Sequence, residues 1–441
     1  MKTFFGGIHP KSHKDASHIP ITTLPPPEEL TIPVMQHIGT PAVPCVKVGD
    51  TVLMGQKIAE AQGFMSANIH SPVSGVVKSI EKRLHPNGLP TESIIITNDF
   101  KNTSAPELKR SSRDYKALSP EEIISYIREA GIVGVGGATF PTHVKFSPPA
   151  EAKIDHIILN GAECEPYLTS DHRSMLENAW DIVTGLAIIM RIFNLKEGYI
   201  GIESNKNDAI EKMKAVAAKF NDGKIHIVTL KTKYPQGSEK QLIYAITKRK
   251  LKSGQLPWQV GCIVSNVETA RVIKRAVVNH VPLSKRIITV GGDAVKKPGN
   301  YYVPIGTSFS HILEHAGGFR KYVNKVIMGG PMMGTAVPNI SVPVIKGTSG
   351  ILAFGEEFAK LDQAGPCLNC SKCVFACPMN LQPNLLDKMS RANDFDALEK
   401  LHIFDCLECG SCAYVCPSKR RQVQEIKIAK VKIKNIKKKA E

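Results

Sequence analysis

Two identical cysteine runs near the carboxyl end constrain this chain more than any other feature. Each run has the spacing C-x2-C-x2-C-x3-C and is followed by proline. The first run is Cys367, Cys370, Cys373 and Cys377, and the second is Cys406, Cys409, Cys412 and Cys416. Three thiolates this close together can cap three irons of one cubane, while the fourth cysteine of such a run ligates the other cluster. The spacing therefore predicts two [4Fe–4S] clusters.

The crossing of the fourth cysteines gives each cluster a complete ligand set. One set is Cys367, Cys370, Cys373 and Cys416, and the other is Cys406, Cys409, Cys412 and Cys377. Zinc is an alternative, but a zinc site usually takes two C-x2-C pairs, and two complete four-cysteine runs fit it poorly. A disulfide framework is less favoured, because a chain of 441 residues can build its own core. Two adjacent clusters indicate a path for single electrons.

Length and composition indicate a globular protein of about three domains. Hydrophobic residues make up 42% of the chain, which is ordinary for this class. The longest apolar run, Ile182–Met190, is too short to cross a bilayer, and the first residues lack the apolar length of a secretory signal. Outside the two cysteine runs only Cys45, Cys164 and Cys262 occur, which suits a reducing compartment. We therefore expect the protein in the cytoplasm or on the cytoplasmic face of a membrane.

The formal net charge of +17 is concentrated at the carboxyl end. From Pro417 onward the chain contains ten Lys or Arg residues and only two Glu, which gives a local charge of +8. No nucleic-acid-binding signature accompanies this charge, so a nucleic-acid partner is not expected. Four apolar residues, Ile426, Ala429, Ile433 and Ile436, share one face of a possible helix. The segment 426–441 is predicted to dock on a membrane complex or anionic lipid, with a solvated, disordered end as the alternative.

The first hundred residues are rich in proline and glycine and predict β-structure. Apolar residues alternate in 46–59 and again in 69–80, each around turn residues. These two segments resemble the barrel-sandwich hybrid fold of biotinyl and lipoyl domains. Such carriers acylate a lysine at a hairpin tip, and the corresponding segment 63–68 has none. The resemblance therefore implies a structural or docking role rather than a carrier.

A polar linker, 101–118, leads into a region where strands and helices alternate. Ser119, Pro120 and Glu122 form a helix start with a capping box. Predicted strands at 154–159, 199–202 and 224–230 are separated by predicted helices at 171–193, 208–220 and 238–250. This order predicts a parallel sheet with ligands at the carboxyl ends of its strands. The segments 160–166 and 234–239 fall at those ends.

A glycine-rich loop, 131–145, lies ahead of these strands. Glycines let backbone N–H groups approach a phosphate or a flat ring without a Cβ in the way. The loop does not match the dinucleotide fingerprint G-x-G-x-x-G, and no strand directly precedes it. A Rossmann site is therefore not expected here.

Four motifs in order are similar to those of the flavin- and NADH-binding subunit of respiratory complex I. The matching segments are 134–145, 160–166, 234–243 and 266–269. Residues 285–345 are similar to the SLBB module, a β-grasp unit that follows in that family. The sequence departs from the family at Thr139, Ala162 and Ser238, where complex I has Gly, Asp and Glu.

The whole chain resembles the C subunits of Rnf-type electron-transport complexes, including the start Phe5-Gly-Gly-Ile-His-Pro10. The resemblance implies a multidomain α/β and α+β protein. Its expected parts are a barrel-sandwich hybrid (1–100), a linker (101–118), a flavin domain with a mostly parallel sheet (119–284), an SLBB module (285–345), a helical double-cluster ferredoxin domain (356–425) and a basic tail (426–441).

The resemblance also implies cofactors and partners. The expected cofactors are FMN and two [4Fe–4S] clusters, with NAD(H) as substrate. Expected flavin- and nicotinamide-site residues are Gly134, Gly136, Gly137, Phe140, Lys145, Asn160, Glu163, Glu165, Glu239 and Asn266. Expected partners are the other subunits of the membrane complex and a ferredoxin or ferredoxin-like subunit, with peripheral binding at the cytoplasmic face of the plasma membrane.

Two other functions are compatible with these parts. The chain could be an iron–sulfur relay whose flavin fold has lost its cofactor. It could also resemble the cobalamin reductase of bacterial microcompartments, although in that enzyme the hybrid barrel is not N-terminal. The primary interpretation is an oxidoreductase subunit that moves electrons between NAD(H), FMN and the clusters, with the complex coupling this transfer to ion translocation.

Overall fold

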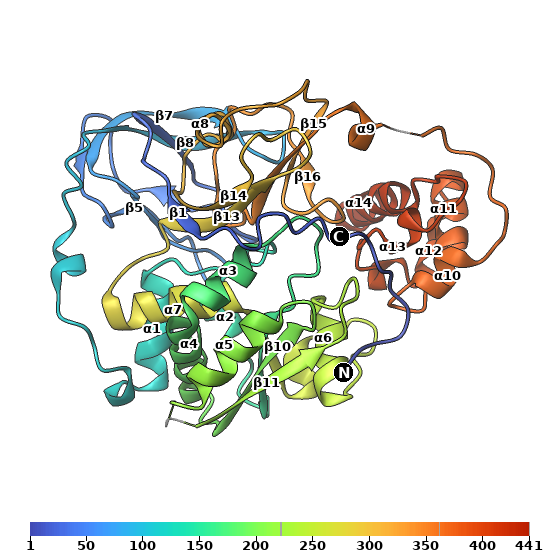
Figure 1. The fold of residues 1–441 in the computed structure, drawn as a ribbon, viewed down its shortest axis with the longest axis horizontal. Helices are drawn as coiled ribbons and strands as arrows, with labels where there is room; N and C mark the ends of the chain where they lie inside the picture. Colours follow the sequence, from blue (N-terminus) through green and yellow to red (C-terminus); the bar gives the residue numbers. More distant parts are fainter. Residues whose placement is uncertain (221–222, 361, 441) are drawn as a thin grey trace.

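The structure, a computed structural model, describes residues 1–220, 223–360 and 362–440, and the side chains up to residue 438. Two β-rich units lie over a central α/β unit, and a helical unit, drawn orange to red, lies at one side (Figure 1). This arrangement confirms the predicted combination of barrel, parallel-sheet, β-grasp-like and helical parts.

The hybrid barrel consists of two small antiparallel sheets. One sheet has the order β2-β8-β7-β4, and the other has the order β3-β5-β6. The strands are β2 (Glu29–Pro33), β3 (Val43–Pro44), β4 (Thr51–Val52), β5 (Lys57–Glu60), β6 (Ile69–His70), β7 (Gly75–Leu84) and β8 (Pro90–Asn98). Alternating residues such as Leu30 and Ile32 point into a shared core with Ile58 and Ile94.

The central unit contains a four-stranded, fully parallel sheet in the order β11-β10-β9-β12. Its strands are β9 (His156–Gly161), β10 (Glu197–Glu203), β11 (Lys224–Leu230) and β12 (Cys262–Asn266). The helices are α1 (Pro120–Glu129), α2 (Thr142–Lys145), α3 (Ser170–Glu177), α4 (Ala179–Ile192), α5 (Asn207–Ala217), α6 (Glu239–Thr247) and α7 (Val267–Asn279). Helices cover the sheet, and apolar residues of its strands are buried in two clusters, with Ile157 and Leu159 in one and Ile158 and Val264 in the other.

Two local predictions for this unit have different outcomes. The capping box at the start of α1 is confirmed, since Ser119 and Glu122 exchange both bonds. The single helix predicted at 171–193 is wrong, because the chain breaks at Asn178 into α3 and α4. Asn178 leaves the helical region (φ −122°, ψ 26°), in keeping with the tendency of asparagine to leave helices.

The second β-rich unit is built on a six-stranded sheet in the order β1-β14-β13-β17-β15-β16. Its members are β1 (Ile21–Thr23), β13 (Lys285–Gly291), β14 (Gly299–Pro304), β15 (Lys325–Met328), β16 (Thr335–Ala336) and β17 (Gly350–Phe354), with helix α8 (Phe309–His315). Strands β13 and β14 form an antiparallel pair. Strand β1 joins this sheet from the amino end of the chain by pairing parallel to β14.

The hairpin-tip segment of the barrel lies against the glycine-rich loop of the central unit. The carbonyl of Phe64 is 2.9 Å from Nε2 of His143, and the Ile38 amide donates to the Thr139 carbonyl (3.3 Å). The fully buried Lys346 donates to the carbonyls of Asn68 (2.6 Å) and Gly131 (2.7 Å), which belong to the barrel and the central unit. Burial lowers the pKa of Lys346 to about 7. The barrel therefore supports the loop, in agreement with the expected docking role.

The helical unit follows α9 (Glu356–Ala359) and contains α10 (Lys372–Ala376), α11 (Pro383–Ala392), α12 (Phe395–Lys400), α13 (Ser411–Tyr414) and α14 (Gln422–Ala440). Ile426, Ala429 and Ile433 of α14 are buried in one core with Leu386 and Leu398. The apolar stripe interpreted above as a docking surface is therefore part of this core, and its fourth member, Ile436, is exposed. We propose that the ferredoxin unit continues through α14 instead of ending at residue 425.

None of the helices in the described ranges combines the length and apolar character that crossing a bilayer requires.

The burial of α14 leads to a first prediction. Ile426→Ala should destabilise the ferredoxin unit by about 2–5 kcal/mol, because it opens a cavity where the side chain is 1% exposed. Ile428→Ala is the matched control, since Ile428 lies on the same helix and is 52% exposed; its effect should stay within about 0.5 kcal/mol. Denaturant titration of the iron-loaded chain, followed by visible cluster absorbance, measures both. Equal midpoints for the two variants would contradict the packing.

Candidate functional site

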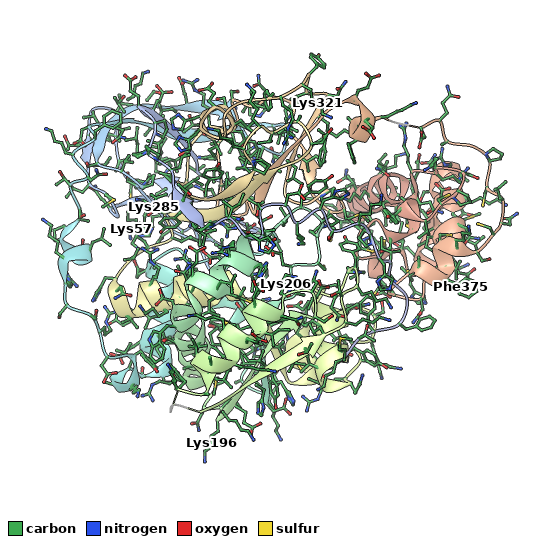
Figure 2. The ribbon with its side chains drawn as sticks, in the orientation of Figure 1. Lys57, Lys196, Lys206, Lys285, Lys321 and Phe375 are labelled. Carbon is green, nitrogen blue, oxygen red and sulfur yellow. The ribbon has the colours of Figure 1, made fainter. Side chains whose placement is uncertain are left out.

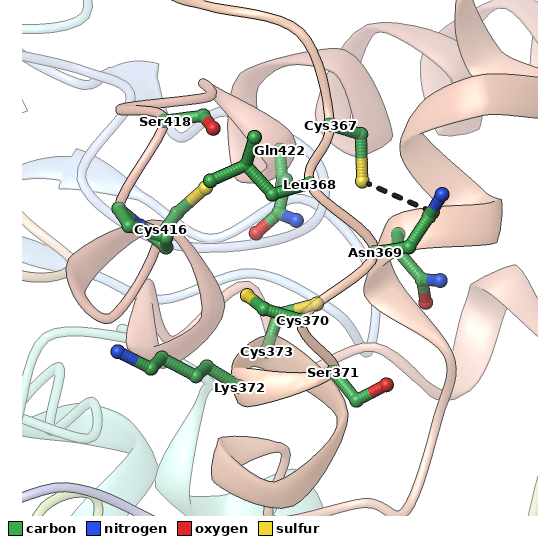
Figure 3. A pocket seen from close by; sticks show the side chains of 12 residues that line it. Cys367, Leu368, Asn369, Cys370, Ser371, Lys372, Cys373, Cys416, Ser418 and Gln422 are labelled. Carbon is green, nitrogen blue, oxygen red and sulfur yellow. Dashed lines mark hydrogen bonds between the residues drawn. The ribbon is translucent and has the colours of Figure 1, made fainter.

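Four thiols line a small cavity at the outer side of the helical unit (Figure 3). They belong to Cys367, Cys370, Cys373 and Cys416, so the fourth cysteine of the second run meets the first three of the first run. Cys367 and Cys370 are exposed, whereas Cys373 is buried. Nearby Phe375 is exposed at the outer edge of the same unit (Figure 2).

A second cavity of the same kind is lined by Cys377, Cys406, Cys409 and Cys412. The structure thus brings together both thiol sets that the spacing predicted. Burial raises the pKa of the Cys406 thiol to about 11, and it raises the pKa of Cys412 as well. Iron loading must therefore release protons from thiols that are neutral at pH 7. Soft thiolate donors are the ligands that iron–sulfur clusters take, so the residues fit the predicted clusters.

The two cysteine runs share the same backbone conformation. Asn369 and Glu408 occupy equivalent places between the first and second cysteines, with φ of +50° and +58°. Ser371 and Gly410 precede the third cysteines, with φ of +58° and +80°. Left-handed backbone is uncommon outside glycine, and such outliers gather at ligand sites. The repeated turns place the first three thiols of each run around one cavity.

A separate cleft opens at the carboxyl ends of β9 and β12 in the central unit. Its volume is about 610 Å³, including the part open to solvent. The lining residues are Gly134, Gly136, Ala138, Phe140, Thr142, Lys145, Asn160, Gly237, Glu239, Val264, Ser265, Asn266 and Thr269. Seven of these were predicted from the sequence: Gly134, Gly136, Phe140, Lys145, Asn160, Glu239 and Asn266.

Two asparagines meet at the floor of this cleft because their strands are neighbours. Asn160 is the next-to-last residue of β9 and Asn266 ends β12, and the two residues are paired in the parallel register. Asn160 donates from Nδ2 to the carbonyl of Gly237 (2.7 Å), and Asn266 donates to Oδ2 of Asp171 (2.7 Å). Burial raises the pKa of Asp171, and the nearby Glu163 carboxylate adds to this rise.

The glycine-rich loop forms one wall of the cleft. The Gly134 amide donates to the Phe140 carbonyl (2.9 Å), and the Thr139 amide donates to the Gly134 carbonyl (3.1 Å). A Cβ on Gly136 would lie 3.2 Å from the Asn266 side chain, a tight contact to which that side chain would have to yield by a few tenths of an ångström. Thr139, where complex I has glycine, takes the left-handed conformation (φ +51°) despite its β-branch. Thr139 thus adopts a backbone conformation that glycine adopts at no steric cost.

One charged pair lies at the mouth of the cleft. Lys145 Nζ is 3.0 Å from Oε1 of Glu239 and also donates to the Val264 carbonyl (3.0 Å). Both side chains are partly exposed, so the ammonium remains accessible to a ligand phosphate. A glycine wall, two amide side chains and one accessible cation fit the phosphate and ring of FMN.

Three predicted cofactor residues do not line the cleft. Gly137 belongs to the glycine-rich loop with φ +112°, and no protein atom lies within 4 Å of a Cβ built there. Glu163 accepts hydrogen bonds from the backbone amides of Asp171 (2.7 Å) and His172 (3.2 Å) at the start of α3. Glu165 accepts from the amides of Met332 (3.0 Å) and Met333 (2.9 Å), and burial raises its pKa. Both glutamates thus hold backbone in this structure, and their contact with a cofactor stays a prediction.

Sequence reasoning missed other lining residues. Val264 and Ser265 precede Asn266 on β12, a strand that we did not predict although Cys262–Val264 is apolar. Thr269 was inside a matching motif without an assigned role, and its hydroxyl accepts the Val135 amide (3.1 Å). This bond joins the glycine-rich loop to α7.

Four known protein domains match successive segments of the chain. The profile of the RnfC barrel sandwich hybrid domain matches residues 2–101, and that of the Nuo51 FMN-binding domain matches residues 127–275. The SLBB domain matches residues 287–336, and the 4Fe-4S dicluster domain matches residues 366–420.

Solved structures resemble the chain in fold alone. The NAD+-reducing [NiFe]-hydrogenase in the H2-reduced state superposes with a TM-score of 0.54 at 17% identity, covering 73% of this chain and 65% of that chain.

Several curated proteins are similar over nearly the full length. The C subunit of the proton-translocating ferredoxin:NAD(+) oxidoreductase complex of Clostridium ljungdahlii is 46% identical, over 98% of this chain and 94% of that protein. The C subunit of the Na(+)-translocating complex of Acetobacterium woodii is 45% identical, over 98% and 97%. The C subunit of the ion-translocating oxidoreductase complex of Rhodobacter capsulatus is 42% identical, over 90% and 76%. The chain therefore belongs to the RnfC family, the C subunits of ion-translocating oxidoreductase complexes.

Proposed function

We propose that this protein is the peripheral subunit that moves electrons between NAD(H) and two [4Fe–4S] clusters by way of FMN. The observation that carries the proposal is the presence, in one chain, of a flavin-type cleft and two four-thiol cavities. The partners are the other subunits of a membrane-bound complex and a ferredoxin or ferredoxin-like subunit. The complex couples this transfer to ion translocation, as the names of the relatives say of their own complexes.

The proposed roles follow from the chemistry of the residues. Bound FMN accepts two electrons as hydride and releases them singly, which matches NAD(H) to one-electron clusters. Lys145 offsets phosphate charge, and the loop with Gly134, Gly136 and Gly137 allows close approach. Asn160 and Asn266 orient the cofactor from the strand ends.

The remaining cofactor-site residues act at the edges of the cleft. Phe140 packs against the ring, and Glu239 faces the nicotinamide side. Glu163 and Glu165 act through the backbone that they hold. The eight motif cysteines are the cluster ligands in the crossed sets given above.

We further propose that the protein sits on the cytoplasmic face of the plasma membrane, bound through its partners. The exposed thiols Cys367 and Cys370 support an electron exit to a partner at the outer side of the helical unit.

The second prediction tests the function itself. In anaerobically reconstituted protein, NADH should bleach the cluster absorbance when FMN is bound, and dithionite should bleach it with or without FMN. Stopped-flow absorbance measures both reactions, with the flavin-stripped chain as control. Clusters that respond to dithionite but never to NADH, with FMN bound, would make the chain a relay fed by another subunit.

The third prediction concerns Gly137. A Cβ at this position meets no protein atom, but the φ of +112° strains any side chain, so Gly137→Val should disturb the loop locally and fill space proposed for the cofactor while the clusters stay intact. Gly88→Val is the control, because Gly88 also has a positive φ (+88°) and open surroundings. We expect lost FMN retention in the first variant only, measured by flavin fluorescence of denatured samples. Retention in both variants would remove Gly137 from the site.

The fourth prediction concerns the crossed ligands. Cys377→Ser should alter the electron paramagnetic resonance signal of the cluster held by Cys406, Cys409 and Cys412, because the fourth thiol is missing there. Cys416→Ser should alter the signal of the other cluster. If each substitution changed only the cluster of its own run, the crossed assignment would be wrong.

A further inference from the structure

The first ten residues of the chain run between the central unit and the helical unit. In Figure 1 this dark-blue segment starts beside α6 and β11, passes the helical unit and continues to β1. Lys2 forms a parallel bridge with Leu230, where β11 ends. Its side chain also donates to the Ile246 carbonyl (2.8 Å) at the end of α6. The segment is therefore attached to the central unit at its beginning.

Two neighbouring residues of this segment, Gly7 and Ile8, then form hydrogen bonds to the helical unit and to the central unit. The Gly7 amide donates to the carbonyl of Ala376 (2.9 Å), next to the cluster cysteine Cys377. Ile8 and Tyr234 exchange both backbone hydrogen bonds (2.8 and 2.9 Å). One dipeptide thus joins a cluster loop to the loop that carries Gly237 of the flavin-type cleft.

The packing on both sides leaves no room for a side chain. Gly6 has φ +74°, and a Cβ on it would lie 2.6 Å from the carbonyl oxygen of Cys377. Gly7 has φ +77°, and a Cβ on it would lie 2.6 Å from the carbonyl oxygen of Tyr234. Contacts this short force the backbone apart, so both glycines set the spacing between the units.

Tyr234 of the central unit also contacts the helical unit directly. Its hydroxyl donates to the carbonyl of Cys409 (2.7 Å), and its side chain is fully buried. Ile8, Ala376 and Cys409 pack around it in one apolar cluster. Only two residues of the same loop separate Tyr234 from Gly237, which lines the cleft.

The covalent connection does not provide this attachment. The segment that leads from α9 to α10 swings around the outside of the molecule (Figure 1). Its described residues 362–371 are exposed except Gly365. The amino-terminal segment, together with the bond from Gln241 to the Pro378 carbonyl (2.6 Å), holds the cluster loops in place.

We propose that Lys2–Pro10 is a positioning strap that holds the loops of Cys377 and Cys409 against the loop Tyr234–Gly237. The strap thereby makes the cluster of Cys377, Cys406, Cys409 and Cys412 the one that exchanges electrons with the flavin site. This inference rests on the proposed function. For each NADH oxidised to NAD+ and a proton, two electrons cross this contact one at a time, each reducing the cluster by one electron before passing to the partner.

The test compares Gly6→Ala and Gly7→Ala with Gly254→Ala in the reconstituted full chain. Gly254 is the matched control, because its φ (+72°) is nearly the same and a Cβ there meets nothing within 4 Å. The strap variants should slow NADH-driven cluster bleaching by roughly tenfold to a hundredfold, the scale of an ångström-sized misplacement. Dithionite-driven bleaching, iron content and flavin content should stay unchanged. NADH rates equal to that of the control in both strap variants would overturn the proposal.

A second readout does not depend on NADH. Hydrogen–deuterium exchange should become faster at residues 232–241 and 374–380 in the strap variants and stay unchanged in the control. Tyr234→Phe, which keeps the ring and removes the hydroxyl that bonds the Cys409 carbonyl and interacts with Glu165, should give the same pattern more weakly, even if an alanine variant fails to fold. Unchanged exchange in every variant that folds would overturn the strap. A wild-type chain that ignores NADH while the exchange pattern holds would refute the proposed function alone.

Discussion

Electron transfer between two cofactors becomes rapidly slower with distance, so the protein must hold its two kinds of site close together. In this chain that requirement falls on one small contact around Tyr234, where a flavin-site loop, a cluster loop and the amino-terminal segment meet. The contact is apolar and tightly packed, and it uses glycine where a side chain would separate the units. The long exposed connection before the cysteine runs then needs no rigidity of its own.

The cleft itself depends on support from outside its own sheet. The barrel tip contacts the glycine-rich loop through Phe64 and Ile38, and Lys346 joins the barrel to the end of α1 through two carbonyls. These hydrogen bonds tie the barrel to the glycine-rich loop and to the chain just after α1. A fold that elsewhere serves as a mobile carrier here serves as a rigid support.

Much of the chain could be predicted because the signals are local. Each of these signals is formed by residues that are close to one another in the sequence. They are the cysteine spacing, the capping box at Ser119, the alternation of strands and helices, and the glycine-rich loop. The wrong extent of the predicted helix 171–193 reflects a local break at Asn178, whereas the packing of α14 depends on residues distant in the sequence. The sequence pattern of the apolar face of α14 is the same whether that face contacts lipid or packs against Leu386, as it does in the structure. Glu163 and Glu165 stand beside the cleft in sequence, but their carboxylates turn to backbone amides of α3 and of Met332–Met333.

The sequence by itself determined the chemistry of this protein: eight thiols spaced for two cubanes, and a glycine loop with ordered polar residues for a flavin. Spacing is enough there because a cluster or a phosphate is held by residues within one turn or one strand end. Only the tertiary structure placed the loops of Cys377 and Cys409 beside the loop Tyr234–Gly237, with residues 2–10 in contact with both. This arrangement depends on contacts between residues more than a hundred positions apart, whose pairing is decided by packing and leaves no periodic pattern in the chain.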